Sequence, residues 1–549
     1  MFQQIRDPLD SLLGTWVVAL MPVVALLLFL AVFRVSAWRA TLIGSIITFL
    51  LAWLVWHMPP GQGLLAYFYG SLTGVWNVDW ITFWGVILFN TLVITGVFDR
   101  FRRWLIANGT QDIRAQTILF AWAFGALLEG LVGFGYPWAV VAPILIALGI
   151  PDLDALRVAA IANNAPVSYG ALGSPIIGLA AVAGVAIAPQ VPQHEVLMLF
   201  SASVGHIVAI LALLPPWILI YLVSGRAGLR DGWPLAVVGS LGYVAGQYPV
   251  AVYLGPYLPD VSGAIVCFLS VFVLLKLWQP RQVLGYGGKP LPAGEGNLAP
   301  VHNLTPWQVV EAWMPFVILI VVVVAWTGPW SPLPKVTWLT MKIEAISSVI
   351  NGRPVTAMFR FTPFVGGSAI LVSWIAVAFA LRVTRAQLRE IFRKTLQQMW
   401  GALLVGVFIF GLAYVYNYSG MAASLAYAFS KLGWSFIIVA PILGWIGVAL
   451  SGSNTSTNAM FGAFQAIVGK LLGFPLLLLP TLNSVGAELG KPVAPQTASV
   501  GVSTTRFVRN EGEVIRHNFP WTLVLLAYLI VIGVACYFFF PAAMAFPEQ

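Results

Sequence analysis

The feature that most constrains this chain is a series of apolar runs, each long enough to cross a lipid bilayer. The runs lie at roughly 12–34, 38–57, 80–98, 156–189, 196–223, 233–256, 261–278, 306–327, 364–382, 396–417, 473–505 and 519–541. A membrane helix needs about 20 apolar residues, so the sequence predicts about 12 crossings. Charged residues make up only 9% of the 549 residues, too few to cover a water-soluble surface. We therefore predict an all-α polytopic membrane protein.

Basic residues gather in the loops that follow every odd-numbered run. These loops carry Arg34 and Arg39; Arg100, Arg102 and Arg103; Arg226 and Arg230; Lys276, Arg281 and Lys289; Arg382, Arg385, Arg389, Arg393 and Lys394; and Arg506, Arg509 and Arg516. Loops rich in Lys and Arg remain in the cytoplasm, which places both termini outside it. The net charge of +9 follows from these loops, so no nucleic-acid partner is expected.

Three further segments are predicted to lie outside or along the membrane surface. The 64–79 segment is short and is expected to lie along the interface, with Asp79 outside and solvated. The 328–363 segment is the longest outside loop, and its strand-like stretch VTWLTMKIEAISSVI is expected to form a small cap. The basic amphipathic stretch 383–395 is expected at the inner surface.

Two other apolar segments, 113–150 and 434–470, are interrupted by Gly and polar residues, as are the runs that follow them. The first pair contains LLEGLVGFG and NNAPVSYGALGSP, and the second contains LSGSNTSTN and NSVGAELGKPVAP. Asn163 and Pro175 are 12 positions apart, as are Asn483 and Pro495. The matching spacing predicts a repeat with two broken or re-entrant helical hairpins.

The loop charges give the two copies of this repeat opposite directions across the membrane. The predicted organisation is a first scaffold segment at 1–79, a first transport repeat at 80–223, linker crossings and a cytoplasmic loop at 224–305, a second scaffold segment at 306–395, and a second transport repeat at 396–549. Inverted-topology repeats with broken helices are typical of secondary transporters, whose substrate site lies near the bilayer midplane.

A helix that is interrupted inside the membrane exposes free backbone N–H groups, whose positive dipole end favours an anion such as a carboxylate. The candidate substrate-binding residues at the interruptions are Gly130, Gly133, Asn163, Asn164, Ser168, Tyr169, Ser451, Ser453, Asn454, Thr455, Asn458, Asn483 and Lys491. Glu129 lies within an apolar run, where desolvation favours binding of a proton.

The stretches LLEGLVGFGYP, NNAPVSYGALGSP, LSGSNTSTNAMFG and NSVGAELGKPVAPQ resemble the lactate permease family of bacterial secondary transporters. The resemblance implies symport of lactate or glycolate with protons across the bacterial inner membrane, and functional roles for Glu129, Asn163, Ser451, Asn454, Asn458, Asn483 and Lys491. Dimers are common in the wider group, so a homodimer is compatible with it. Many members carry an acid where this chain has Asn454, which bears on the substrate and on the coupling ratio.

Each candidate also has a structural interpretation. Glu129 can cap a broken helix instead of carrying a proton, and Lys491 can pair with Glu488 or reach an interface instead of binding substrate. The 451–458 run can serve as interhelical hydrogen-bonding groups. Tyr169 can simply be packed, and His206 is expected to be a core residue rather than a proton relay.

Other functions compete with that of a proton-coupled permease. A sodium-coupled carboxylate transporter is the alternative, with sodium held by Asn side chains and carbonyl groups. An enzyme is not predicted, because the sequence has no nucleophile elbow, metal-ligand spacing or nucleotide loop. No cofactor or metal is expected, and the duplicated broken helices argue against a channel or receptor.

Overall fold

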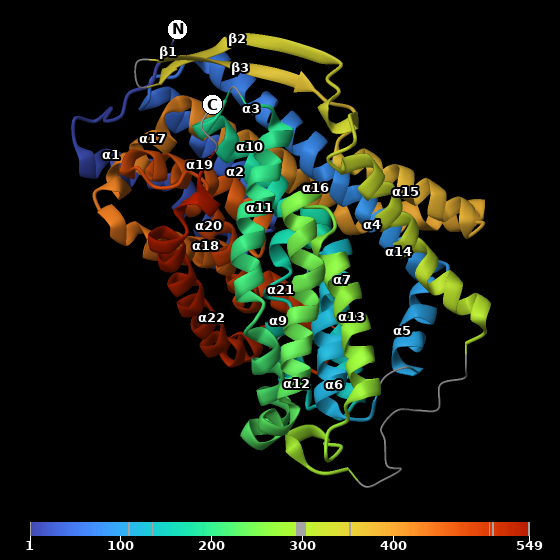
Figure 1. Cartoon of the computed structure of the whole chain (residues 1–549). Coiled ribbons are helices and arrows are strands. Elements are labelled where there is room, and N and C mark those ends of the chain that lie inside the picture. The colour runs from blue at the N-terminus through green and yellow to red at the C-terminus, as the bar shows by residue number, and fades with distance from the viewer. Residues whose placement is uncertain are drawn as a thin grey trace.

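The structure is a computed structural model that describes residues 2–107, 110–133, 135–189, 191–291, 304–350, 353–503, 505–507 and 510–546. Among these residues, ten helical stretches are long and apolar enough to cross a membrane (Figure 1). Ser11 caps the first of them, α1 (Leu12–Ala31), by accepting from the backbone N–H of Gly14. The predicted membrane protein is therefore confirmed, whereas its number of crossings and its orientation stay predictions.

The first half of the chain continues from α1 through a series of helices that ends before a long kinked helix. These elements are α2 (Ala37–Leu54), α3 (Pro60–Gly74), η1 (Val75–Asp79), α4 (Trp80–Ile94), α5 (Val97–Ala107), α6 (Ile113–Gln116), η2 (Thr117–Ala123), α7 (Phe124–Leu131), α8 (Tyr136–Ala147), α9 (Asp152–Ala162), η3 (Val167–Tyr169), α10 (Gly170–Ile187) and α11 (Gln193–Leu211). Two helices follow as a pair, α12 (Pro215–Tyr253), which bends at Gly225 (φ +68°), and α13 (Pro259–Leu277).

The second half repeats this order of elements. It consists of α14 (Pro306–Thr327), α15 (Gly366–Ala380), α16 (Arg385–Ser419), α17 (Met421–Ser430), α18 (Phe436–Ser451), α19 (Asn454–Leu472), α20 (Leu478–Gly490), η7 (Lys491–Val493), α21 (Pro495–Val502) and α22 (Glu511–Phe539). In each half a 35-residue helical stretch, Pro60–Ile94 or Arg385–Ser419, precedes a short helix, a hairpin, a broken helix and a last long helix. This order agrees with the duplication inferred from the sequence.

The interfacial position expected for 64–79 is wrong. Helix α3 and the π-helical turn η1 continue directly into α4, and α3 packs along α16. Gly70 and Gly74 allow this contact, because a Cβ at Gly70 would overlap the carbonyl of Phe410 and one at Gly74 would crowd that of Gly406. Gly, Asn and Asp lower the hydropathy of residues 60–79, so the first half of this helix is not recognisable as a membrane helix in the sequence.

A three-stranded sheet covers one end of the molecule, so the fold is not entirely helical. Strands β2 (Leu339–Ile350) and β3 (Arg353–Phe361) form an antiparallel hairpin. The strand-like stretch that the sequence showed contains β2, whereas β3 was not predicted. The short β1 (Phe2–Gln3) pairs parallel to β2. Figure 1 shows both ends of the chain on this side, opposite the bend of α12 with Arg226 and Arg230.

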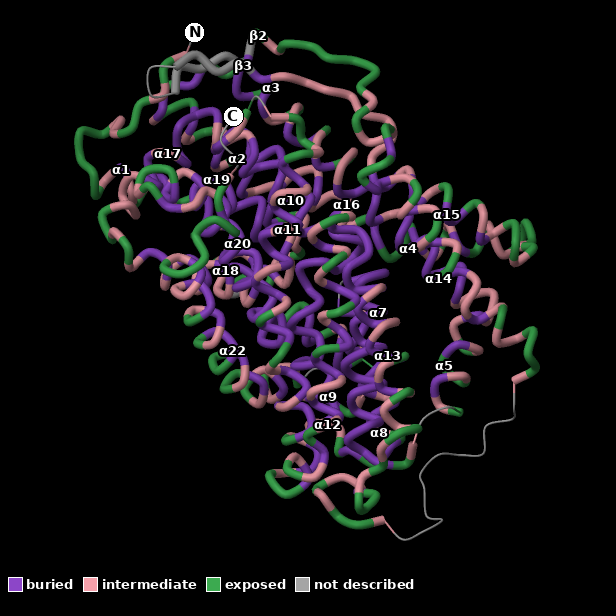
Figure 2. The backbone as a smooth tube through the Cα atoms, in the orientation of Figure 1, coloured by how far each residue is buried: buried purple, intermediate pink, exposed green. Residues whose placement is uncertain are grey.

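Burial separates a peripheral part from a central part (Figure 2). The exposed side chains of α1 include Leu13, Val17, Met21, Val24 and Leu28, which recur on one helical face and are suited to contact lipid. Helix α10, in contrast, is buried along nearly its whole length. The broken helices therefore form the centre of the protein.

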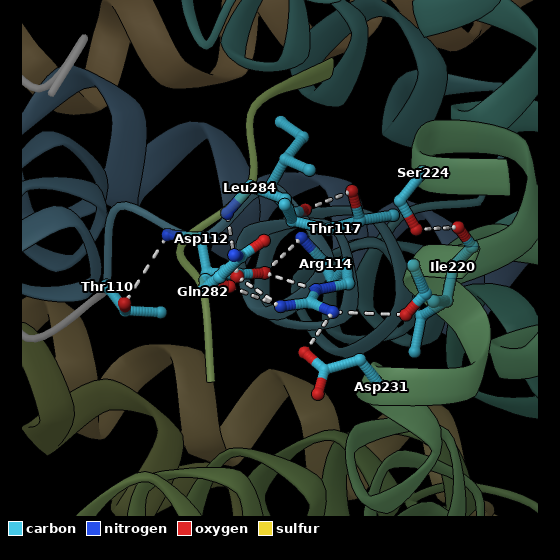
Figure 3. Close-up of polar contacts among 11 residues, drawn as sticks. Thr110, Asp112, Arg114, Thr117, Ile220, Ser224, Asp231, Gln282 and Leu284 are labelled. Carbon is cyan, nitrogen blue, oxygen red and sulfur yellow. Dashed lines mark hydrogen bonds and ion pairs between the residues drawn. The ribbon is translucent and has the colours of Figure 1, made fainter. Parts of the chain in front are cut away.

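Arg114 anchors the start of the first hairpin at the end of the molecule opposite the sheet. The fully buried guanidinium donates to both carboxylate oxygens of Asp112, at 2.9 and 2.7 Å, and to Asp231 at 2.9 Å (Figure 3). It also donates to the carbonyls of Gly228 and Gln282, and Asp112 accepts from the N–H of Leu284. A buried charge is tolerated only with such full pairing, so this cluster joins α6 to α12 and to the loop after α13.

Candidate functional site

Three interruptions of helices meet in the centre of the protein. The first is the turn after α7, where Gly133 and Gly135 have φ values of +67° and +79°. The second extends from the end of α9 into the first residues of α10, where residues 171–173 have positive φ. The third is the turn Lys491–Val493 after α20, followed by the proline that begins α21. Pro and Gly at these points remove helix hydrogen bonds and permit left-handed backbone, which explains why the helices break here.

Glu129 connects these three interruptions. Its Oε1 accepts a hydrogen bond from Lys491 Nζ at 2.5 Å, and its Oε2 accepts one from Asn163 Nδ2 at 3.0 Å. The side chains of Glu129 and Lys491 are 2% and 7% exposed, so the ion pair is almost fully enclosed. The carboxylate of Glu129 packs against Gly170, because a Cβ at that glycine would lie only 2.5 Å from Oε1 of Glu129.

A chain of amide and hydroxyl groups fills the space between α19, α20 and the start of α10. Gln465 donates to Asn483, Asn483 donates to Asn458, and Asn458 donates to Ser484, each at 3.0 Å. Ser484 lies 3.4 Å from Ser168. Asn454 donates to the carbonyl of Ser484 at 3.2 Å. The candidates Asn454, Asn458, Asn483 and Ser168 therefore belong to one buried network that joins the two halves.

Asn483 does not begin an interruption, as the sequence spacing suggested. It lies in the middle of α20, and the break follows eight residues later at Lys491. The corresponding break in the first half begins at Asn163, directly after α9. The equal spacing to Pro175 and Pro495 is thus not a structural equivalence of the two asparagines.

Sequence reasoning missed three polar residues of this region. Gln465 belongs to the amide chain, and it lies on the same face of α19 as Asn458, which helical spacing could have shown. Asp260, at the start of α13, accepts from the hydroxyl of Tyr243 at 2.9 Å and approaches α7 where Gly130 lacks a side chain. Glu488, expected only as a partner of Lys491, instead accepts from the backbone N–H of Ser168 at 3.0 Å.

Two other candidates have different surroundings. The hydroxyl of Tyr169 donates to the carbonyl of Ser201 at 2.7 Å, and the side chain is fully buried. Both polar atoms of the Asn164 side chain are buried and have no hydrogen-bond partner within the part of the chain that the structure describes. The ring of His206 is tilted against that of Tyr248, with 5.5 Å between the ring centroids.

The remaining candidates Ser451, Ser453 and Thr455 face a cavity of about 450 Å³. The hairpin tip 451–456 and α21 form one wall of the cavity, and α1, α2, η1 and α16 form the other. Ser453 caps α19 by accepting from the N–H of Ser456, so the N-terminus of this 19-residue helix faces the cavity. Such a helix end favours a carboxylate.

A second cavity of about 570 Å³ lies on the side of the β-sheet. We call this space the outer cavity and the one at the hairpin tip 451–456 the inner cavity. The two approach each other along η1, α10 and α16. Val75, Ile177 and Tyr414 line the outer cavity, and Val78, Ser174 and Phe410 line the inner cavity. Between them, the Cβ position of Gly178 is 3.1 Å from Thr455 and 3.2 Å from the Phe410 ring. A thin layer of packed side chains therefore separates the two spaces.

Asp79 was expected outside and solvated, and this expectation is wrong. It is the last residue of η1, near the middle of the continuous stretch Pro60–Ile94, and it lines the inner cavity with only 8% of its surface exposed. The error has the same origin as the misplacement of 64–79, because the crossing begins 20 residues earlier than its most apolar part suggests.

Comparison with known proteins gives consistent results over nearly the full chain. A family model described as L-lactate permease matches residues 15–541. The glycolate permease GlcA of Escherichia coli (strain K12) is 32% identical over 96% of this chain and 97% of that protein. The L-lactate permease of Bacillus subtilis (strain 168) is 30% identical over 95% of this chain and 96% of that protein. The solved Alcanivorax borkumensis YdaH transporter is 15% identical, covers 87% of this chain and 88% of its own, and has a TM-score of 0.47.

Proposed function

This chain belongs to the L-lactate permease family, and we propose that it imports a small 2-hydroxy monocarboxylate, lactate or glycolate, in symport with protons. The names of the two relatives support this substrate class, since one is a glycolate permease and the other an L-lactate permease. Both acids combine a carboxylate with a neighbouring hydroxyl. A site for them needs backbone N–H donors for the first group and neutral polar side chains for the second.

The inner cavity supplies both kinds of group. The N-terminus of α19 presents its free N–H groups there, and Ser451, Ser453 and Thr455 add hydroxyls. On the opposite wall, the cavity is bounded by apolar side chains such as Leu26 and Phe410. We propose that the substrate carboxylate lies at the end of α19 and that its methyl or methylene group faces this apolar wall.

The enclosed pair of Glu129 and Lys491 is the single observation that carries the proposed proton coupling. Protonation of Glu129 removes its charge and leaves the ammonium of Lys491 buried without a counter-ion, which is strongly unfavourable. An incoming carboxylate compensates that positive charge, so a proton and an organic anion favour each other's binding. The turn of Lys491 leads directly into α21, which contributes Gln496 and Thr497 to the wall of the inner cavity. The pair is thereby linked to the substrate space.

The test is uptake of labelled L-lactate by the full chain in liposomes. An inward proton gradient is expected to increase the initial rate and to drive accumulation, and sodium is expected to have no effect. Uptake that follows a sodium gradient and ignores the proton gradient would support the sodium-coupled alternative. In it, the ion is held by side-chain oxygens such as those of Asn163 and Asn454, which have no hydrogen-bond partner among the described residues.

The variant Glu129→Gln tests whether Glu129 is needed for proton coupling. The amide keeps the size and one acceptor but holds no exchangeable charge, so accumulation driven by the proton gradient is expected to disappear. Glu390→Gln is the matched control, because Glu390 is exposed on the basic first turns of α16. Proton-driven accumulation in a folded Glu129→Gln protein would remove Glu129 from the coupling mechanism.

A further inference from the structure

The inner cavity contains one carboxyl group that the roles proposed above leave unused. Asp79 is the only ionisable side chain among the described residues that line this cavity. Its Oδ2 is buried and has no hydrogen-bond partner in the described part of the chain. It lines the same cavity as Ser451, Ser453 and Thr455, so a carboxylate bound at the end of α19 would share this cavity with it.

The local structure of the helix directs Asp79 into this position. Residues Val75–Asp79 form a π-helical turn within an otherwise α-helical stretch. Such turns place an extra residue in the helix and occur frequently at functional sites. On the neighbouring α16, Gly406 leaves room for the carboxyl group, because a Cβ there would overlap Oδ1 of Asp79.

No basic side chain neutralises Asp79 among the described residues. The elements packed against η1 are α3, α4, α10, α15 and α16, and the first four contain no Asp, Glu, Lys, Arg or His. The charged residues of α16 all precede Gln398, its first residue at the cavity; they are Arg385, Arg389, Glu390, Arg393 and Lys394. The other titratable groups of these helices are the tyrosines Tyr67, Tyr69, Tyr414, Tyr416 and Tyr418.

This environment distinguishes Asp79 from Glu129. Glu129 has a cation and an amide donor, whereas an ionised Asp79 would be nine-tenths buried without either. Burial of an unpaired carboxylate is costly, and the addition of a second anion to the same cavity increases the cost. A protonated Asp79, in contrast, is neutral and presents an O–H donor to the substrate.

We propose that Asp79 is a proton-binding residue of the substrate cavity, and that it must hold a proton for the monocarboxylate anion to bind. The inference rests on the proposed function and adds a second coupling residue to it, on the opposite wall from the hairpin tip. The cavity borders Ser36 and Trp38 at the start of α2, beside the basic residues Arg34 and Arg39, and Gln398 after the basic turns of α16. Since those loops are predicted to be cytoplasmic, Asp79 would release its proton to the cytoplasm with the substrate.

The number of protons taken up when lactate binds tests directly whether Asp79 must be protonated for binding. L-lactate is added to the purified full chain in weakly buffered detergent solution that contains a pH indicator, and lactate affinity is determined by calorimetry across a series of pH values. The wild-type protein is expected to take up protons, and its affinity to weaken by up to about tenfold per pH unit for each obligatory proton. Lactate binding without any proton uptake by the wild-type protein would contradict the proposed coupling itself.

Substitutions at Asp79 then show how much of this proton uptake depends on that residue. Asp79→Asn is expected to take up about one proton fewer per lactate and to reduce the pH dependence of the affinity by that one proton. Asp79→Glu should retain both properties, and Asp99→Asn, an exposed acid paired with Arg102, is the control that should match the wild type. A folded Asp79→Asn protein with wild-type proton uptake and pH dependence would overturn the inference while leaving the proposed function intact.

A second variant keeps the test decisive if Asp79→Asn does not fold. Thr82 lines the same cavity three residues after Asp79, on the same helical face. Thr82→Lys would place a cation beside Asp79 and keep it ionised, so proton uptake is again expected to fall by about one per lactate. Unchanged uptake in a folded Thr82→Lys protein would count against Asp79 in the same way.

Discussion

The backbone N–H of Ser168 donates a hydrogen bond to Oε1 of Glu488 at 3.0 Å, although the two residues are 320 positions apart. Ser168 lies in the interruption between α9 and α10, and Glu488 lies in the last turn of α20. A free N–H group of one broken helix is therefore satisfied by a side chain of the other half. The two halves depend on each other at the point where each lacks its own helical hydrogen bonds.

We expect Glu488→Ala to destabilise the protein and Glu488→Gln to do so much less. Alanine leaves the buried N–H of Ser168 without an acceptor, at a cost of about 1–3 kcal/mol. The glutamine oxygen can still accept this bond. Apparent melting temperatures in detergent would compare the two variants, and equal stability of Glu488→Ala and the wild type would show that the N–H finds another partner.

The ion pair of Glu129 and Lys491 predicts a double-mutant effect on stability. Lys491→Met leaves the buried Glu129 without its cation, and Glu129→Gln leaves Lys491 without its anion; each loss is expected to cost on the order of 3–5 kcal/mol. The double variant removes both charges and should recover much of the lost stability. Additive losses, measured by melting temperature in detergent, would mean that the pair is not coupled in solution.

The sequence alone predicted the membrane helices, the interruptions and most of the polar residues near them, because lipid makes every buried polar group conspicuous. The strand β2 was also recognisable, although its partner β3 was not predicted. Asp79 and the helix before it were misplaced, since hydropathy averages over a window and cannot show that α3 is packed against α16.

The sequence did not show which residues of one half contact which residues of the other half. From the sequence, Lys491 could bind substrate, pair with Glu488 or reach an interface, and only the fold brings Glu129, 362 positions away, into contact with it. Asp260 lies at the start of a helix that was expected to be a linker, yet a glycine on α7 allows the two helices to approach each other. Such contacts depend on tertiary packing rather than on local pattern.

The glycines of α20 provide a test of how the second hairpin packs. Gly486 and Gly490 are one turn apart and face the backbone of α18, so that a Cβ would overlap the carbonyl of Pro441 or of Trp445. Gly486→Ala is expected to lower stability by about 1–3 kcal/mol through overpacking. Gly61→Ala is the control, since its Cβ meets nothing within 4 Å. Similar melting temperatures of the two variants would contradict close packing of α18 and α20.

Asp154 predicts how stability depends on acid pH at the end of the molecule opposite the sheet. Its carboxylate accepts from Arg157 at 2.5 Å and from the Tyr286 hydroxyl at 2.6 Å, and it lies 3.2 Å from His517 Nε2. These contacts join α9 to α22 and to the loop after α13. Partial burial acts to raise the pKa of Asp154, but the hydrogen bonds from Tyr286 and His517 and the charge of Arg157 outweigh it and lower the pKa.

A carboxyl group whose pKa is lowered by folding stabilises the protein above its ordinary pKa, which is about 3.9 for Asp, and loses this effect as the pH falls through the lowered value. Asp154→Asn is therefore expected to melt below the wild type at about pH 5, and the difference should shrink below about pH 4. Tyr286→Phe removes one of the hydrogen bonds that lower the pKa, so in that background the same loss should begin at a higher pH. A difference between wild type and Asp154→Asn that does not change from about pH 5 down to about pH 3 would show that Asp154 contributes by packing rather than by charge.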